Sequence, residues 1–429
     1  MTDSTIFALA SGAGRAGVAV VRLSGPRAGA ALAALAGPLP PPRMAALRRL
    51  AHDGVEIDQG LVLWFPAPAS FTGEDVGELH LHGGAAVRGA LFAALSALGL
   101  KPAEPGEFSR RAVENGKLDL TRAEAIADLV DAQTEAQRRQ ALRQYDGVLA
   151  DLYEGWRARL LMALGRAEAA IDFSDDGVGE AEFDAAREAA IHLAAEIKAH
   201  LDDGGRGEAL REGVRLAIIG PPNAGKSSLL NALAGRDAAI VSDIAGTTRD
   251  VIEVRLDLGG VLVIAADTAG LRESDDAIEA EGMRRALARA GEAHLTLLLL
   301  DASAAAPRAG VPADLTPDLI VWNKADLAAH DGISISLKTG AGVPALLDLL
   351  RQRVRQKFSG EEAPALTRPR HRAALTEALT TLDHAARAAQ PELLAEDLRL
   401  AMRAVGRITG RVDVEEVLDF VFRDFCIGK

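Results

Sequence analysis

The 429-residue sequence contains a single cysteine and few aromatic residues. One thiol can form neither an intramolecular disulfide nor a multi-cysteine zinc site, so we expect a reducing, cytoplasmic compartment. Hydrophobic residues make up 48% of the chain, but aromatic residues make up only 4%. Alanine supplies much of the difference, which favours long alanine-rich helices over bulky β-sandwiches.

Long apolar runs and an excess of basic residues are also missing. No stretch of about 18 uncharged apolar residues occurs, and the start of the chain has no export signal. We therefore expect a protein that is neither exported nor membrane-spanning. Lys and Arg total 48 against 61 Asp and Glu, and the net charge of -13 argues against indiscriminate polyanion binding. A local basic patch could still bind RNA.

The length predicts about three domains, because a domain commonly has ~150 residues. Residues 1–118 mix short β-rich runs with turns, typical of an α+β domain. Residues 119–210 and 359–429 have the three- and four-residue apolar spacing of helices, whereas 211–358 alternate strands, glycine loops and helices. We infer a multidomain α+β and α/β fold, in which an all-α helical domain carries an inserted α/β domain.

A phosphate-binding loop opens the α/β segment. The strand-like residues 214–219 lead into GPPNAGKS at 220–227, and an apolar helix follows from Ser228. This matches G-x-x-x-x-G-K-[ST] in the strand, loop and helix context that the motif requires. In such loops backbone amides surround the phosphates, Lys226 reaches the outer phosphates and the Ser227 hydroxyl binds Mg²⁺.

Further segments follow in the order of a guanine-nucleotide switch protein. AGTTRD (245–250) offers the Thr248 hydroxyl to Mg²⁺ and the γ-phosphate, and DTAG (267–270) directs Asp267 toward the metal. NKAD (323–326) ends another apolar strand, where the Asp326 carboxylate can accept two hydrogen bonds that guanine donates and adenine cannot. SLK (336–338) resembles the motif behind the base. The sequence thus predicts a Ras-like P-loop GTPase domain.

The predicted GTP-binding residues lie in these segments. They are Asn223, Ala224, Gly225, Lys226, Ser227, Ser228, Ser242, Asp243, Ile244, Ala245, Gly246, Thr247, Thr248, Asp267, Thr268, Ala269, Gly270, Asn323, Lys324, Ala325, Asp326, Ser336 and Lys338. Leu271 stands where Ras-like proteins have the glutamine that orients the attacking water. Glu279 is a candidate for that task, although a solvated helix carboxylate is the other reading.

Five further motifs carry a resemblance over nearly the whole chain. They are FTGED (71–75), HGG (82–84), PGEFS (105–109), NGKLDL (115–120) and the terminal FCIGK (425–429). With the GTPase motifs, they resemble the MnmE (TrmE) family of tRNA-modification GTPases. The resemblance implies a homodimer, formed through the N-terminal domains, that works with the FAD-dependent partner MnmG. Together they would add a (carboxymethyl)aminomethyl-type group at C5 of the wobble uridine of certain tRNAs.

The resemblance also implies cofactors and their residues. The one-carbon unit would come from 5-formyl-tetrahydrofolate or a related tetrahydrofolate, with ligand positions Arg22, Glu78, Lys117 and Lys429. Cations suit the glutamate-tail carboxylates of a folate, and a carboxylate suits the pterin N–H donors. K⁺ would stimulate hydrolysis when two GTPase domains pair, bound by Asn223, Ser242, the Ile244 carbonyl and Thr247. Glu279 matches the catalytic glutamate of the family.

Other readings stay open for several residues. Cys426 is implied as a catalytic thiol, adding to C6 of the uridine or lying near the folate, but an isolated cysteine is more often a small apolar side chain. Glu78, His80 and His82 alternate on one strand, where a polar strand face is a simpler explanation than a metal site.

RNA contact is the least specified feature of the sequence. Arg399, Arg403 and Arg407 share a helix face, and residues 368–372 form a basic cluster. Either could meet phosphates or remain a solvated surface with local ion pairs. A ribosome-assembly GTPase without modification chemistry is the alternative function.

Overall fold

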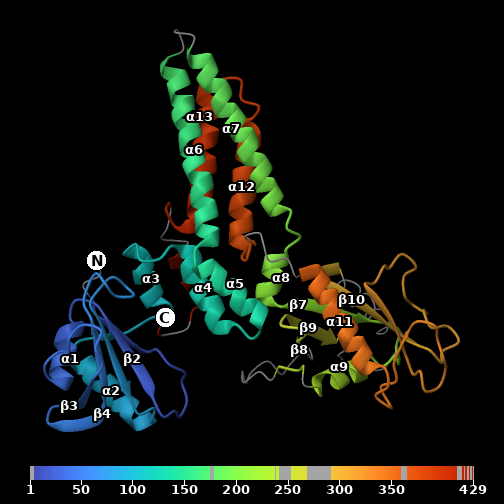
Figure 1. Cartoon of the computed structure of the whole chain (residues 1–429), viewed down its shortest axis with the longest axis horizontal. Helices are drawn as coiled ribbons and strands as arrows, with labels where there is room; N and C mark the ends of the chain where they lie inside the picture. Colours follow the sequence, from blue (N-terminus) through green and yellow to red (C-terminus); the bar gives the residue numbers. More distant parts are fainter. Residues whose placement is uncertain are drawn as a thin grey trace. The chain divides into compact units, whose positions relative to one another are not determined.

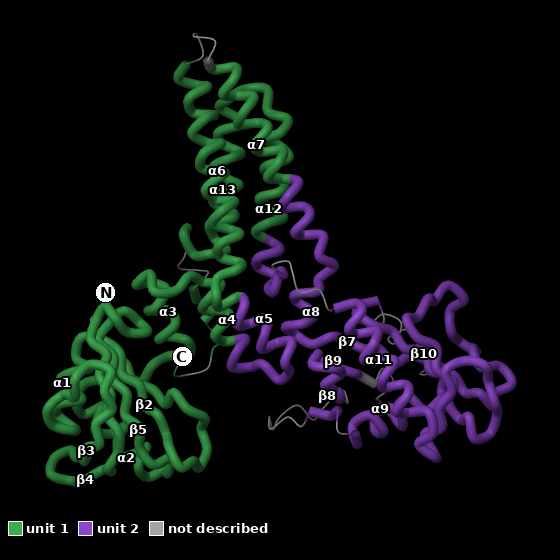
Figure 2. The backbone as a smooth tube through the Cα atoms, in the orientation of Figure 1, with its two compact units in different colours: residues 1–127, 144–194, 374–429 green, residues 128–143, 195–373 purple. Residues whose placement is uncertain are grey.

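The computed structural model describes residues 4–173, 178–236, 238–240, 253–267, 291–358 and 365–412, together with Leu418, Asp419, Val421, Phe422, Phe425 and Gly428. For Val178, Ala266 and Asp267 it describes the backbone alone. The chain forms two compact units (Figure 2): residues 1–127, 144–194 and 374–429 make the first, and residues 128–143 and 195–373 make the second.

The N-terminal part of the first unit is a two-layer α+β structure (Figure 1). Its strands are β1 Ile6–Leu9, β2 Ala19–Ser24, β3 Ala46–His52, β4 Val55–Phe65, β5 Val76–Leu81 and β6 Lys101–Pro102, in the order β3-β4-β5-β2-β1-β6. Neighbouring strands are antiparallel, except β1 and β6. Helices α1 Ala28–Ala36 and α2 Ala85–Ala97 pack on the sheet, and Leu32 and Leu95 join Val21 and Leu79 in its core. Burial of these aliphatic side chains holds the two layers together.

Helices make up most of the rest of the first unit and part of the second. They are α3 Glu107–Glu114, α4 Leu120–Asp131, α5 Glu135–Tyr145, α6 Val148–Asp172, α7 Val178–Leu201, α8 Arg206–Glu212, α12 Pro369–Ala385 and α13 Pro391–Thr409. Helices α6 and α13, far apart in the sequence, pack along each other (Figure 1). Ala163 and Ala167 of α6 and Ala401 and Ala404 of α13 are buried, and such small side chains allow close helix packing. This confirms the interpretation of the alanine-rich composition.

The second unit contains an α/β sheet in the order β12-β11-β10-β7-β9-β8. Its strands are β7 Val214–Ile219, β8 Glu253–Asp257, β9 Leu262–Asp267, β10 Leu295–Asp301, β11 Leu319–Asn323 and β12 Ile333–Ser334, with helices α9 Lys226–Ala234 and α11 Val343–Phe358. Every pair is parallel except β8 and β9. Buried aliphatic strands are typical of parallel sheets, and Leu297, Leu299 and Val321 are fully buried.

The predicted fold class is confirmed: an α+β domain, a helical domain and an inserted Ras-like P-loop domain. The contact-based units place residues 128–143 and 195–210 with the α/β sheet, so the domain boundaries at 119 and 210 stay a sequence prediction. No helix among the described residues is long and apolar enough to cross a membrane.

Candidate functional site

The phosphate loop joins β7 to α9 through unusual backbone angles. Gly220 has φ +154°, and a Cβ there would lie 2.1 Å from the Leu299 carbonyl oxygen of β10. Gly225 (φ +100°) caps α9, and Asn223 (φ +60°) also lies in the left-handed region. Glycine adopts such angles without strain, so the loop can curl tightly against the sheet. A loop of this kind turns backbone amides toward an anion at the N-terminus of the helix.

The side chain of Lys226 lies across this loop. Its Nζ donates hydrogen bonds to the carbonyl oxygens of Gly220 and Pro221, both at 2.9 Å. Ser227 and Ser228 follow in the first turn of α9. The cation and the hydroxyls are therefore placed together at the helix start, as the sequence motif predicts.

Asn323 connects the phosphate loop to the base-recognition segment. It ends β11, opposite Asp301 in the parallel register, and is buried. Its Nδ2 donates to the Ala224 carbonyl at 2.8 Å, and its Oδ1 accepts the Leu337 backbone N–H at 3.3 Å. A single side chain thus ties together the three loops of the predicted GTP site that the structure describes.

The carboxylate of Asp326 is held as a hydrogen-bond acceptor. The Ser336 hydroxyl donates to its Oδ1 at 2.6 Å, and Ala325 is fixed by its N–H to the Ile335 carbonyl at 3.0 Å. The Ser336 hydrogen bond, aided by the nearby Lys338 and Lys324, lowers the pKa of Asp326. The ionised form is the one that can accept two N–H donors of guanine.

Asp301 is a site residue that sequence reasoning missed. Its Oδ2 pairs with Lys324 Nζ at 2.5 Å, and Lys324 has a left-handed backbone (φ +62°). Burial alone would raise the pKa of Asp301, but hydrogen bonds from Lys324 and Ser303 outweigh it and lower that pKa. The available signal was an acidic residue at the end of the apolar strand beside the NKAD strand.

Many predicted residues of the GTP site lie outside the described residues. They are Ser242, Asp243, Ile244, Ala245, Gly246, Thr247, Thr248, Thr268, Ala269, Gly270 and Glu279. For Asp267 the backbone is placed at the end of β9, opposite Ile218 of β7. The described part of the site therefore covers the phosphate loop and the base-recognition loops.

A second site lies on the N-terminal sheet, where Arg22 and Glu78 face each other across β2 and β5. The Nε and Nη2 atoms of Arg22 donate to Glu78 Oε1 at 3.0 and 2.9 Å. The Arg22 guanidinium also lies 5.5 Å from the Phe71 ring centroid and 5.9 Å from that of Phe108. Two of the four predicted folate ligands are therefore adjacent, and they are oriented by an ion pair and two aromatic rings.

The neighbouring histidines lie within hydrogen-bonding distance of carboxylates. His80 Nε2 lies 3.2 Å from Glu78 Oε2, and His82 Nδ1 lies 2.9 Å from Asp58 Oδ1. Hydrogen bonds from His82 outweigh the opposing effect of burial, and they lower the pKa of Asp58. No metal-binding group of three His, Cys, Asp or Glu occurs among the described residues. The contacts match a polar strand face.

Lys117 and Gly428 of the C-terminal segment also contact the N-terminal domain. Lys117 Nζ donates to the Pro68 carbonyl at 3.0 Å. Cys426 and Lys429 lie outside the described residues, but between them a Cβ on Gly428 would lie 2.1 Å from the Leu9 carbonyl of β1. The C-terminal tail therefore reaches the strand that pairs with the Arg22 strand.

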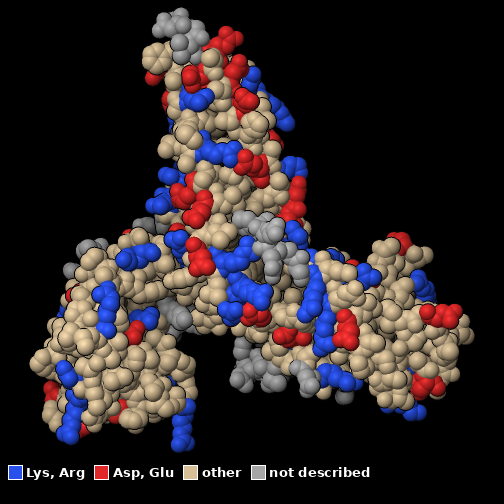
Figure 3. Space-filling model, in the orientation of Figure 1, with Lys and Arg blue, Asp and Glu red and all other residues tan. Residues whose placement is uncertain are grey.

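The arginines proposed for RNA contact take part in ion pairs. On α13, Arg399 pairs with Glu168 at 2.7 Å, and Arg407 pairs with Glu377. Figure 3 shows acidic and basic side chains interspersed over these helices.

The basic cluster at 368–372 is also paired, within the second unit. Arg368 pairs with Asp128 at 2.6 Å, and Arg372 pairs with Asp203 at 2.7 Å. RNA contact by either group of arginines stays a prediction.

Comparison with known proteins identifies the family. The profile described as the GTP-binding protein TrmE N-terminus matches residues 5–117, and that of the MnmE helical domain matches residues 120–426. The chain belongs to the MnmE family of tRNA-modification GTPases. The first match covers the Arg22–Glu78 site, and the second covers the GTP site.

Full-length MnmE relatives are more than half identical to this chain. The proteins named tRNA modification GTPase MnmE from Parvibaculum lavamentivorans and Rhodospirillum rubrum are 58% and 55% identical, over 99% and 100% of this chain and all of each relative. The protein of that name from Paramagnetospirillum magneticum is 57% identical, over the whole of both chains. Among solved structures, the G domain of the T. maritima FeoB iron transporter covers 32% of this chain and 98% of its own, at 20% identity and a TM-score of 0.21.

Proposed function

We propose that this MnmE-family GTPase hydrolyses GTP to drive modification of the wobble uridine of tRNA, with a tetrahydrofolate as the source of the one-carbon unit. The observation that carries the proposal is the position of the C-terminal tail. Gly428 lies against Leu9, whose neighbour Ala8 pairs with Arg22. Gly428, two residues after Cys426 in the sequence, thus lies against β1, which pairs with the Arg22 strand β2.

The N-terminal site suits a folate by its chemistry. Arg22 offers a planar donor group for a carboxylate, and Lys117 offers a compact cation. The Glu78 carboxylate, which already accepts from Arg22, has a second oxygen within reach of His80 and can accept pterin N–H donors. Lys429 is proposed as a further ligand from the same family resemblance. When bound, the folate would supply the one-carbon unit.

The GTP site suits nucleotide hydrolysis with two cations. Ser227 would hold Mg²⁺ together with Thr248, and Asn223, Ser242, Thr247 and the Ile244 carbonyl would hold K⁺. Asn223 lies in the phosphate loop, before the start of α9, and has a left-handed backbone. Glu279 is proposed to orient the attacking water, because Leu271 cannot. Potassium would then stimulate hydrolysis when two GTPase domains pair.

A homodimer through the N-terminal domain is supported by apolar side chains on two adjacent strands. Leu47 of β3 and Leu61 of β4 are paired in register and are 59% and 40% exposed. Met44, just before β3, is 59% exposed. Apolar side chains gathered on strand faces are typical of protein interfaces. The FAD-dependent MnmG and tRNA are the proposed partners in a cytoplasmic complex.

Mass spectrometry of tRNA nucleosides tests the function. A deletion strain should lose a wobble-uridine modification that the wild-type gene restores, and Cys426→Ser should fail to restore it while its GTP hydrolysis rate stays unchanged. Unchanged nucleosides in the deletion strain would refute the proposal and favour a ribosome-assembly role. Full modification by Cys426→Ser would refute the catalytic role of the thiol alone.

Ligand binding tests the folate site separately. Arg22→Gln should weaken binding of 5-formyltetrahydrofolate, since it removes a charged guanidinium that would donate hydrogen bonds to the ligand. Arg48→Gln on β3 is the matched control, because Arg48 contacts only the adjacent Leu47 carbonyl in the described hydrogen bonds. Equal affinity of the Arg22 and Arg48 variants would contradict the assignment.

A further inference from the structure

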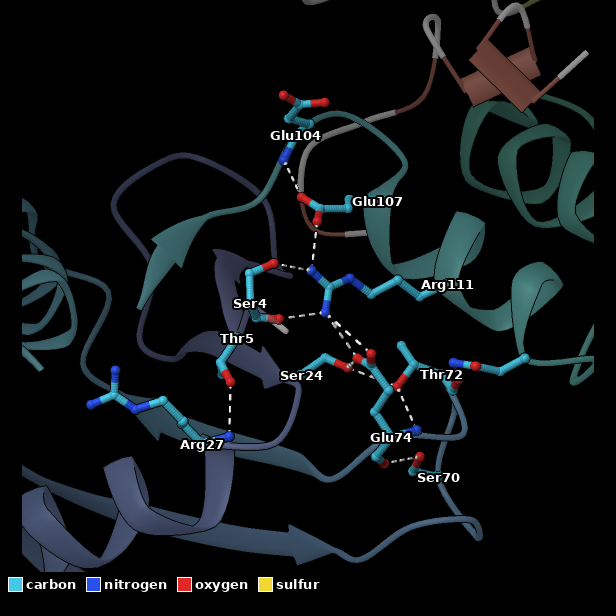
Figure 4. Close-up of polar contacts among 11 residues, drawn as sticks. Ser4, Thr5, Ser24, Arg27, Ser70, Thr72, Glu74, Glu104, Glu107 and Arg111 are labelled. Atoms are coloured by element: carbon cyan, nitrogen blue, oxygen red, sulfur yellow. Dashed lines mark hydrogen bonds and ion pairs between the residues drawn. The ribbon is translucent and has the colours of Figure 1, made fainter. Parts of the chain in front are cut away.

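Arg111 of α3 is a buried cation, and its side chain is 2% exposed. Its Nη1 donates to the Ser4 carbonyl at 2.8 Å and to Glu74 Oε2 at 3.0 Å. Its Nη2 donates to Glu107 Oε1 at 2.8 Å and to Ser4 Oγ at 3.2 Å. Figure 4 shows the guanidinium between these groups, which come from the chain start, the loop before β5 and α3. None of them belongs to the ligand set of the proposed folate site.

Glu74 extends this network into the loop between β4 and β5. Its Oε2 accepts the Ser24 hydroxyl of β2 at 2.7 Å, and Ser24 Oγ lies 2.7 Å from Thr72 Oγ1 (Figure 4). The Ser70 hydroxyl donates to the Glu74 carbonyl at 2.5 Å. The loop at 70–75 is therefore fastened to β2 by hydroxyls and to α3 by Arg111.

The same loop contacts the segment that carries Lys117. Asn115 Nδ2 donates to the Thr72 carbonyl at 2.8 Å. Gly73 has φ +79°, and a Cβ there would lie 3.2 Å from Lys117 Cγ. The position of Lys117 relative to the sheet thus depends on the conformation of this loop.

Each of the two rings beside Arg22 is next in sequence to a member of the network. Phe71 precedes Thr72, and Phe108 follows Glu107. Their centroids lie 5.5 and 5.9 Å from the Arg22 guanidinium carbon. Arg111 therefore joins the loop that carries one ring to the helix that carries the other.

Only an arginine can make these contacts. Its planar fork reaches two carboxylates and a carbonyl in fixed directions, whereas a lysine ammonium is a single point of charge. Two acidic partners offset the desolvation cost of burying the Arg111 cation. Removal of Arg111 would therefore leave the negative charges of Glu74 and Glu107 without a neutralising cation.

We propose that Arg111 is a positioning residue of the N-terminal folate site. Through Glu74 and Glu107 it holds the Phe71 and Phe108 rings beside Arg22 and keeps Lys117 at the same site. The inference rests on the proposed folate function, because it assigns a residue to the binding site of that ligand.

The test measures binding of 5-formyltetrahydrofolate to the full-length protein by isothermal titration calorimetry. Arg111→Lys keeps the positive charge but loses the planar guanidinium that bonds both carboxylates. We expect Kd to rise by about tenfold, the effect typical of residues that orient the ligand-binding side chains without touching the ligand. The GTP hydrolysis rate should not change. Arg110→Lys is the matched control, because Arg110 is the adjacent α3 arginine and pairs with Glu114 and Asp419 outside the network. Its Kd should stay at the wild-type value.

Two additional variants separate positioning from general stability. Glu74→Gln should weaken binding in the same way, and it decides the question if Arg111→Lys does not fold. Phe71→Leu removes one ring, so adding Arg111→Lys to it should raise Kd much less than Arg111→Lys does alone. A wild-type Kd in both Arg111→Lys and Glu74→Gln would overturn the positioning role. So would additive effects of Arg111→Lys and Phe71→Leu on the binding free energy of the double variant. Failure of the wild-type protein to bind would overturn the folate proposal and this inference together.

Discussion

Replacement of Asn323 by alanine is the most direct test of the described GTP site. The side chain donates from Nδ2 to the Ala224 carbonyl of the phosphate loop at 2.8 Å and lies against Gly225 of the same loop, where a Cβ would be 2.4 Å from that nitrogen. It also accepts the Leu337 N–H at 3.3 Å from the loop behind the base. Asn323→Ala therefore separates the phosphate loop from the base loops, and it also removes a predicted GTP-binding side chain.

The size of the effect follows from the two hydrogen bonds and their burial. Asn323 is 3% exposed and Ala224 is fully buried, so the Ala224 carbonyl loses its partner in a place where water enters poorly. A net ~1 kcal/mol for each hydrogen bond and ~1 kcal/mol for the orphaned carbonyl give a loss of about 3 kcal/mol. If the whole of this loss falls on the conformation that binds the nucleotide, the affinity for GDP falls by about two orders of magnitude, because 1.4 kcal/mol corresponds to a factor of ten.

Fluorescence titration with a labelled GDP analogue measures this affinity, and thermal unfolding measures stability in parallel. Ser334→Ala is a suitable control, since its hydroxyl contacts only the backbone carbonyls of His330 and Gly332 in the described hydrogen bonds. A loss smaller than threefold in Asn323→Ala, with an unchanged unfolding midpoint, would refute the idea that this side chain couples the two halves of the site.

Three further outcomes follow from particular contacts. Gly220→Ala should reduce the affinity for the GDP analogue by about 100-fold in the same titration, because its Cβ would meet the Leu299 carbonyl and displace the phosphate loop; near-wild-type binding would contradict this. Burial first, and then nearby cations, lowers the pKa of His294 below 6.5. The neutral imidazole therefore contributes its full share to the free energy of unfolding above pH 6.5, and this contribution is lost as the pH falls toward the lowered pKa. The urea midpoint of wild type should therefore fall more steeply below pH 6.5 than that of His294→Gln, and parallel slopes would refute it. The double substitution Arg403→Glu and Arg407→Glu should weaken tRNA binding in a filter assay, and the difference from wild type should shrink at high salt because phosphate contacts are screened there. Unchanged tRNA binding would show that these arginines do not contact the RNA.

The phosphate loop and the base-recognition motif were predictable from sequence because their chemistry is local. Gly220, Gly225 and Lys226 lie within one short turn, and the strand before it and the helix after it are evident from the apolar pattern. Backbone angles near +100° and +154° at the two glycines are what such a turn requires. Strands β1 and β2 of the N-terminal sheet were also predictable, since they alternate or continue in apolar residues between turn signals.

Pairs formed between distant segments could not be predicted in the same way. Asp301 precedes Lys324 by 23 residues, and only the parallel register of β10 and β11 brings the two together. The arginines at 399 and 407 share a helix face as predicted, but their acidic partners Glu168 and Glu377 lie 231 and 30 residues away. Helix periodicity gives the face of a side chain and says nothing of which helix covers it.

Arg111 shows how a motif can be recognised before its physical purpose is understood. In the sequence FTGED and PGEFS indicate only the family, because nothing in their spacing links Glu74 to Glu107. The folded chain places both carboxylates on one guanidinium from α3, and Phe71 and Phe108 lie beside Arg22 as a result. Since an uncompensated buried charge is costly, a change at any one of Glu74, Glu107 and Arg111 should be tolerated only with changes at the others. The two acidic motifs are therefore best understood as parts of one electrostatic unit that determines the shape of the N-terminal site.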